Sequence, residues 1–277
     1  MSAAHPPAWL DELALDHDGP PWLAMGLARV PEDEWLVLDD ERPAELAERA
    51  SLLTERHDEV FAALPGTEAA GAEVLALVTG WLAARGHDTA PLLGVHPLEA
   101  AGRLVQEDLV LMVERDGDFH LDAACLCFPS HWRLAEKLGR RTGAVHDPVP
   151  GYEEELAARV DRFLARLRPG VVTARRNWSL HPSAALFAPV PPTPSPGAEL
   201  WLRSERQTLR RLSDSGAVLF TIRVQQMPLA SLVHRPDVAR RLAARLRAQP
   251  SAFTGYQGLA PRLPVVLAGL DDISRGR

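Results

Sequence analysis

The sequence predicts an α+β fold, with an antiparallel five-stranded sheet, helices on one face of it, and helical additions at both ends of the chain. Three observations support this prediction. Alternating apolar residues indicate a β-hairpin near residues 109–127, a helical stretch comes next, and three further strand-like segments follow. Two strands, then helices, then three antiparallel strands is an order typical of an α+β domain.

Composition indicates a globular protein and argues against two classes of partner. Of the 277 residues, 46% are hydrophobic and 24% are charged, which is ordinary for such a protein. The net charge of -7 argues against a nucleic-acid surface, and no apolar run is long enough to span a membrane. Because residues 1–19 have no basic start and carry several acids, they do not resemble a signal peptide, and we expect a cytoplasmic protein.

Residues 1–103 are predicted to form an N-terminal arm and helices that pack on the core. The first forty residues hold three tryptophans among prolines and acids, which indicates an irregular arm. Apolar residues at helical spacing predict helices over 43–64 and 67–85, and Gly86 suits the end of the second.

Residues 104–235 are the predicted core, and they begin with the hairpin. Its two strands alternate over 109–113 and 119–127, and Asp116-Gly117 suits the tight turn between them. The second strand carries Cys125 and Cys127 on one face, at a separation awkward for a disulfide. We therefore expect both thiols to be reduced and buried.

A short helix is predicted next, between Ser130 and Gly139. Ser130 can cap its start, Gly139 can adopt the left-handed conformation that ends it, and His131 and Trp132 fall in its first turn. Prolines at 148 and 150 then restrict the backbone to an extended path. His146 is therefore expected on a stiffened segment, as an iron ligand would need to be, although a histidine beside prolines is more often a turn or core residue.

The remaining elements follow from the same periodicities. A helix is predicted over 152–167, and the loop 189–196 separates strands of one sheet. Residues 236–277 are predicted to form a C-terminal helical segment, with helices over 236–249 and near 263–270. The last three core strands are predicted at 171–180, 200–209 and 217–224.

Several motifs in a fixed order resemble the haem (alpha) subunit family of haem-dependent oxidative N-demethylases. They are FPSHWRLAEKLG at 128–139, VHDPVPGY at 145–152, RRNWSL at 175–180, LRSERQTLRRLSDSGAVLFTIR at 202–223 and YQGL at 256–259. The resemblance runs from about Met25 to Leu270. It implies a haem-binding, PAS-like (Per-ARNT-Sim) domain, with NADPH-dependent oxidative demethylation of dimethylamine as the characterised activity.

The resemblance implies where a b-type haem would bind. His146 is expected to be the axial ligand, because it falls in the family's His-x-Pro-Val-Pro motif and its backbone is restrained. Three other histidines stay open as rivals, and a thiolate from the cysteine pair is a further alternative. The rivals are His120, His131 and His181. The predicted haem-binding residues besides His146 are Trp132, Arg176 and Trp178.

The predicted catalytic residues are Glu205, Arg206, Arg223 and Asn177. A protonated secondary amine needs a carboxylate in a dry pocket, and we expect Glu205 to supply it, while the two arginines would stabilise negative charge that develops on oxygen. Strand alternation puts Arg203, Glu205 and Gln207 on one face. It puts Ser204, Arg206 and Thr208 on the other, and the sequence leaves open which face turns to the haem. The alternative is a cross-strand ion-pair ladder on a solvated face.

Electrons for this reaction must come from elsewhere. The chain has no cluster-type cysteine spacing and no Gly-x-Gly-x-x-Gly fingerprint, so a reductase subunit is expected to bring FMN, a 2Fe-2S cluster and NADPH, as the family implies. The alternatives are a haem-based gas or redox sensor and a haem-free interaction domain. One departure from the family concerns Val224 and Gln225, where a small polar residue and an aromatic are common, so substrate preference is expected to differ if this corner lines the pocket.

Overall fold

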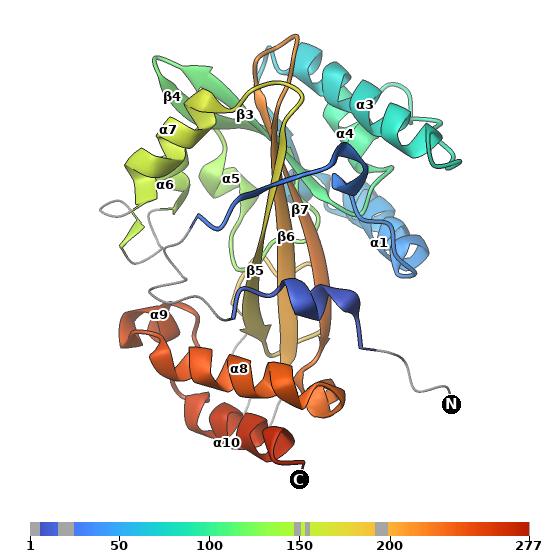
Figure 1. The fold of residues 1–277 in the computed structure, drawn as a ribbon. Helices are drawn as coiled ribbons and strands as arrows, with labels where there is room; N and C mark the ends of the chain where they lie inside the picture. The colour runs from blue at the N-terminus through green and yellow to red at the C-terminus, as the bar shows by residue number, and fades with distance from the viewer. Residues whose placement is uncertain (1–5, 16–24, 147–150, 153–155, 192–198, 277) are drawn as a thin grey trace.

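A single antiparallel sheet of seven strands runs through the centre of the molecule, with the order β1-β5-β6-β7-β3-β4-β2 (Figure 1). The structure is a computed structural model, and it describes residues 6–15, 25–146, 151–152, 156–191 and 199–276. The strands are β1 Ala28–Val30, β2 Phe61–Ala63, β3 Asp108–Arg115, β4 Asp118–Cys125, β5 Val172–His181, β6 Trp201–Arg211 and β7 Val218–Pro228.

The five predicted strand segments are present as β3 to β7, so an α+β fold is confirmed. The two additional strands, β1 and β2, are three residues each and pair at the two edges of the sheet. A strand this short shows no alternation that a sequence pattern could detect. Phe61–Ala63 pairs with the end of β4, so the helix expected to continue to residue 64 is wrong in its last turn.

Helices precede, interrupt and follow the strands along the described chain. Near the N-terminus, the predicted helix over 43–64 is split at Arg56, where φ is -135° and ψ is 36°. The helices are α1 Arg42–Glu55, α2 His57–Val60, α3 Glu68–Ala83, α4 Pro97–Gly102, α5 Leu134–Lys137, α6 Thr142–His146, α7 Ala158–Arg166, α8 Pro236–Ala248, α9 Ser251–Tyr256 and α10 Leu263–Ser274. None of these described helices is long and apolar enough to cross a membrane.

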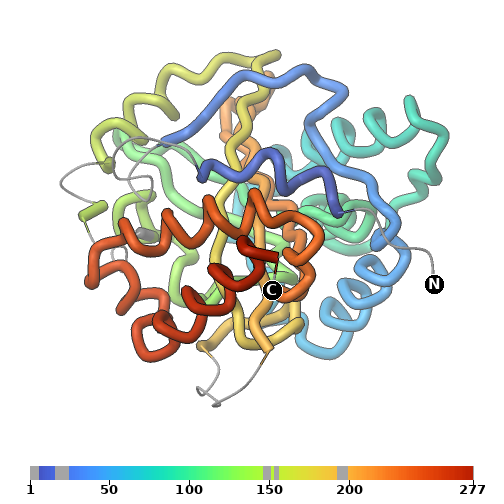
Figure 2. Tube along the Cα trace, turned by 60° about the horizontal axis from the view of Figure 1, so that its bottom comes forward, coloured from blue at the N-terminus to red at the C-terminus, as the bar shows by residue number. Residues whose placement is uncertain are grey.

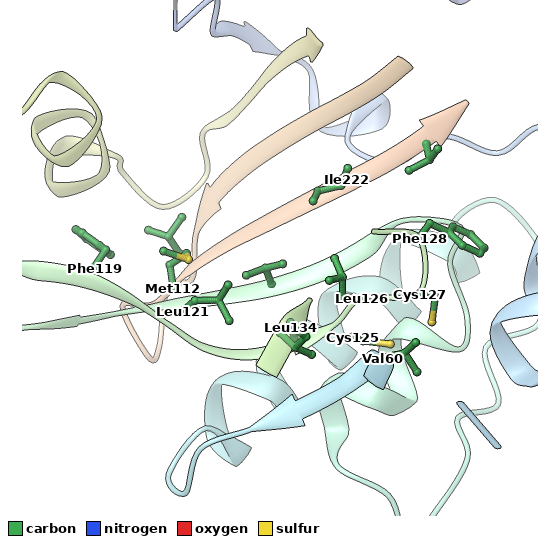
Figure 3. Packing of buried hydrophobic residues seen from close by; sticks show 14 of the residues in the cluster. Val60, Met112, Phe119, Leu121, Cys125, Leu126, Cys127, Phe128, Leu134 and Ile222 are labelled. Atoms are coloured by element: carbon green, nitrogen blue, oxygen red, sulfur yellow. The ribbon is translucent and has the colours of Figure 1, made fainter. Parts of the chain in front are cut away.

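Helices cover both faces of the sheet, and not one face as expected (Figure 1). We call the face that packs against α5 and α7 the inner face; its apolar cluster includes Phe119, Ile222 and Leu134 (Figure 3). The outer face packs against the N-terminal segment, α3 and α4 through a second cluster. A helical period shows that a helix has an apolar side, but it does not show which face of a sheet that side covers.

The C-terminal helices close one end of the sheet. Figure 2 shows α8 and α10 lying across that end, close to the described residues 6–15. Their apolar residues form a third cluster with Trp9, Leu202 and Met227. The predicted C-terminal helices over 236–249 and 263–270 are confirmed.

Candidate functional site

The inner face of β5 and β6 carries a polar strip, which consists of Arg175, Asn177, Arg203, Glu205 and Gln207. The register places Arg175 beside Gln207 and Asn177 beside Glu205. Because alternate residues of a strand point to the same side, all five side chains share one face of the sheet. The sequence predicted Glu205 and Asn177 as site residues, and the structure brings these two together.

A chain of hydrogen bonds orients the carboxylate of Glu205. The Nε of Arg175 donates to Oε1 of Gln207 at 2.7 Å, and Nε2 of Gln207 donates to Oε2 of Glu205 at 3.2 Å. On the other side, Nε of Arg203 lies 3.8 Å from Oε1 of Glu205. The Glu205 side chain keeps 19% of its surface exposed, so a small cation can still reach it.

Two guanidinium groups, one half-buried on Arg175 and one fully buried on Arg203, flank this one carboxylate. Burial lowers the pKa of Arg175 and of Arg203, and the charge of Glu205 partly opposes that effect in both. Arg203 is fully buried and donates two hydrogen bonds to carbonyl oxygens, at 2.6 Å to that of Phe128 and 3.2 Å to that of Leu186. The polar strip therefore carries an excess of positive charge, which an anionic group would compensate.

A pair of histidines, the half-buried His131 and the buried His181, lies next to Arg203. The rings of His131 and His181 stack with centroids 4.6 Å apart, and Ser130 Oγ lies 3.1 Å from His181 Nε2. Burial lowers the pKa of both rings, to about 3 for His181, and the charge of Arg203 lowers both further. Both imidazoles are therefore neutral near pH 7.

His131 has two further properties of a ligand. Its φ is +60°, in the left-handed region that a residue with a side chain rarely adopts. Its Nε2 is buried and has no hydrogen-bond partner among the described residues. Backbone strain and an unpaired buried nitrogen both carry a cost, and they are common at functional sites.

The short helix predicted after Ser130 begins later than expected. His131 and Trp132 precede α5 instead of forming its first turn, and Ser130 contacts His181 instead of capping a helix. Gly139 has a φ of +75°, as its predicted role requires. Trp132 is half-buried and packs against the apolar cluster of the inner face.

His146 is the last residue of α6, so it lies at a helix end and not within an extended segment. Its side chain and the prolines at 148 and 150 lie outside the described residues. Within the described part, α6 begins beside β4, where Thr142 Oγ1 donates to the carbonyl of Phe119 at 3.0 Å.

The other predicted residues lie on the outer face. Arg176, Arg206 and Arg223 form a row across β5, β6 and β7, since the register pairs each with the next. Trp178 shares this face and packs against the C-terminal cluster. The sheet therefore separates these four residues from Glu205, and they cannot line one pocket with it.

Residues near the N-terminus bind the side chains of these three arginines, which we call the outer arginine row. Arg176 donates to Oε2 of Glu12 at 2.8 Å, and Arg206 donates to the carbonyls of Glu34 and Trp35 at 2.6 and 3.1 Å. Arg223 pairs with two carboxylates at 2.7 Å each. These carboxylates belong to Asp39 and Glu45. The three arginines thus hold two described parts of the N-terminal region, residues 8–15 and 25–45, against the sheet.

Sequence reasoning missed Arg175, although a signal for it was present. Arg175 has the same strand parity as Asn177, so alternation alone places it on the same face as that predicted site residue. Arg203 and Gln207 were grouped with Glu205 by parity, but their hydrogen bonds depend on the pairing of β5 with β6.

The described residues include the kinds of chemical group that bind a haem. A haem needs a neutral imidazole, cations for its propionates and an apolar surface for its ring. Neutral imidazole is present at His131, cations at Arg175 and Arg203, and apolar surface at Ile222 and Val224, which pair with Gln207 and Glu205.

The cysteine pair does not fit a haem. Cys125 and Cys127 are free and fully buried, as expected. A Cβ built at Gly102 would overlap the Cys125 sulfur, and Arg49 Nη2 lies 3.7 Å from that sulfur. Because α4 packs directly on Cys125, no room is left there for a macrocycle.

A family model supports the assignment that the motifs suggested. The model described as haem-dependent oxidative N-demethylase, alpha subunit-like, matches residues 26–89 and 86–267. These matches cover most of the chain, including the polar strip, the histidine pair and α6. The chain belongs to the haem-dependent oxidative N-demethylase alpha subunit-like family.

Proposed function

We propose that this chain binds a b-type haem at the inner face of the sheet and demethylates a small secondary amine, such as dimethylamine, with dioxygen. The observation that carries the proposal is the placement of Glu205, an oriented and partly accessible carboxylate beside the buried side chain of Val224. A protonated methylamine needs a carboxylate for its charge and an apolar surface for its methyl groups. Glu205 carries the carboxylate, and the apolar side chain of Val224 lies beside it on β7.

Other carboxylates of the neighbourhood are already engaged. Glu107 accepts from the backbone nitrogen of Val37 at 2.8 Å, and Asp108 accepts from Arg49 at 2.8 Å. The side chains of Glu107 and Asp108 are both fully buried. Glu205 is therefore the carboxylate we assign to the amine.

When bound, the haem would supply the activation of dioxygen, with electrons delivered from a partner. Glu205 would bind the ammonium form and accept its proton, so that the neutral amine is the species oxidised. Gln207 and Arg175 would keep the Glu205 carboxylate in one orientation, since their hydrogen bonds form a chain that ends on Oε2. Asn177, which lies opposite Glu205 on β5, would hydrogen-bond a ligand on the same face.

We propose His146 as the axial ligand, with His131 as the rival. The support for His146 is its motif and its position at the end of α6, next to the apolar cluster that includes Val145. The support for His131 is its neutral ring and unpaired Nε2. The haem would be b-type, because the chain has no Cys-x-x-Cys-His sequence for covalent attachment.

A reductase subunit would provide FMN, a 2Fe-2S cluster and NADPH oxidation. An alpha-subunit-like family supports an enzyme of several subunits. We further propose that residues 104–235 are a PAS-like core, with residues 1–103 and 236–277 as additions to it. The support is the order of elements, since β3 and β4 come first, α5 to α7 follow, and β5 to β7 complete the set.

The test is a dimethylamine titration of the haem-loaded chain, followed by the shift of its Soret band. Glu205→Gln should retain haem and weaken amine binding by roughly 1–3 kcal/mol, the cost of a buried polar group left unmatched. Glu114→Gln is the matched control, because Glu114 is another strand glutamate paired with an arginine, at 3.0 Å from Arg211. An unaltered titration in Glu205→Gln would remove the assignment, and haem binding with no amine response would favour a gas or redox sensor.

A further inference from the structure

Lys137 stands out among the basic residues of this chain. It is the only lysine, and the other 29 of the 30 lysine and arginine residues are arginines. It is buried, with 8% of its surface exposed, although lysine is almost never buried without a partner. Its Nζ donates to the carbonyl oxygen of Val145 at 2.6 Å.

This contact falls at the end of α6. Val145 directly precedes His146, the last residue of that helix. The last carbonyl oxygens of a helix receive no hydrogen bond from within the helix, so a donor from outside must bind them. A cation is favoured there, because the helix dipole is negative at this end. A helix of five residues is too short to be stable alone, so its position depends on such contacts.

The other end of the contact is fixed to the sheet. Gly139 lies two residues after Lys137, and its backbone nitrogen donates to the carbonyl of Leu121 on β4 at 2.6 Å. The backbone nitrogen of Leu121 in turn donates to the carbonyl of Arg140 at 3.0 Å. Lys137 therefore projects from a turn that two hydrogen bonds hold to β4.

We infer that Lys137 is a positioning residue for the haem ligand: its ammonium fixes the peptide before His146 relative to the sheet. The inference rests on the proposed function, because it takes His146 as the ligand. A ligand carried by a short helix would otherwise move with that helix, and the iron–imidazole bond would be held less firmly.

The experiment compares Lys137→Met with Lys137→Arg and with Arg211→Met. Arg211 is the matched control, since its Nη1 also donates to a carbonyl near a helix end, that of Leu164 in α7, at 3.3 Å. The readouts are the rate of haem transfer to apomyoglobin and the electron paramagnetic resonance spectrum of the ferric chain. Both measure the haem without turnover.

Lys137→Met should release haem about tenfold faster and broaden the ferric spectrum, because a hydrogen bond from a charged group is lost. Lys137→Arg should restore much of the wild-type rate, and Arg211→Met should lower thermal stability while haem release stays unchanged. Equal release from Lys137→Met and wild type would overturn the inference, as would equal acceleration in Arg211→Met.

Amine acylation provides a second test that needs no variant. Because Lys137 is the only lysine, an amine reagent reports on it and on the N-terminal amine alone. Haem should slow acylation of Lys137, measured on its peptide by mass spectrometry, and an equal rate with and without haem would overturn the inference. A wild-type chain that takes up no haem would instead refute the proposed function, so the two failures are distinguishable.

Discussion

The Asp108 carboxylate on β3 joins α1 to the chain that follows β4, and its removal should be among the most damaging single changes. Its Oδ1 accepts from Arg49 Nη1 at 2.8 Å and from the backbone nitrogen of Cys127 at 2.7 Å. Its Oδ2 accepts from the nitrogen of Phe128 at 3.0 Å. Both charged side chains are 0% exposed. Asp108 thus fixes the chain just before Ser130 and His131.

The magnitude follows from the burial of this pair. Asp108→Ala leaves Arg49 as a buried charge without its carboxylate, which typically costs about 3–5 kcal/mol. A domain of ordinary stability unfolds at a cost of about 5–15 kcal/mol, so the variant should be marginal. Asp108→Asn keeps an acceptor for the nitrogen of Cys127 and should lose about 1.5–3 kcal/mol, the value of a hydrogen bond to a charged group.

Urea unfolding of the haem-free chain, followed by tryptophan fluorescence, measures these values. Glu59→Ala is the control, because Glu59 pairs with Arg56 at 2.8 Å but is 50% exposed. That surface pair should contribute about 0.5 kcal/mol or less. A cost below about 1 kcal/mol for Asp108→Ala would refute the reasoning, since it would mean that Arg49 is not held as a buried ion.

Three further predictions concern acid, the N-terminal segment and electrons. Burial lowers the pKa of His181 to about 3, whereas an unfolded histidine titrates near 6.5, so the unfolded chain binds more protons between these two pH values. The free energy of unfolding should therefore fall by about 2 kcal/mol from pH 8 to pH 5. Urea titrations at both pH values should show a smaller fall in His181→Gln. Arg206→Met should cost about 1.5–3 kcal/mol and expose residues 25–40 to limited proteolysis, whereas an unchanged cleavage pattern would contradict the role given to the outer arginine row. The haem-loaded chain alone should not oxidise NADPH, and steady NADPH consumption coupled to formaldehyde release without a reductase would exclude the need for a partner.

Local pattern was sufficient for the strands that matter most. Alternation grouped Arg203, Glu205 and Gln207 on one side of β6, and the pairing with Asn177 follows once β5 lies beside it. The sequence could not say which side is the inner one, because both faces of β6 are buried and both bear arginine. Arg203 is 0% exposed on one face and Arg206 is 7% exposed on the other.

Long-range contacts account for what the sequence did not show. The partners of the outer arginines lie far away in the chain, as with Arg176 and Glu12, which are 164 residues apart. The late start of α5 depends on His131, whose left-handed backbone interrupts the helix that Ser130 was expected to cap. Nothing in the local sequence marks that conformation, since it accompanies the stacking of His131 on His181.

The most direct test of the account is the ferric spectrum of the haem-reconstituted chain, recorded by absorption and electron paramagnetic resonance for wild type, His146→Ala and His131→Ala. We expect a Soret band in the wild type, loss or severe weakening of haem binding in His146→Ala with the fold retained, and an unchanged axial ligand in His131→Ala. Undiminished haem with an unchanged spectrum in His146→Ala would contradict the ligand assignment. A wild-type chain without any Soret band would contradict the proposal that this chain binds haem.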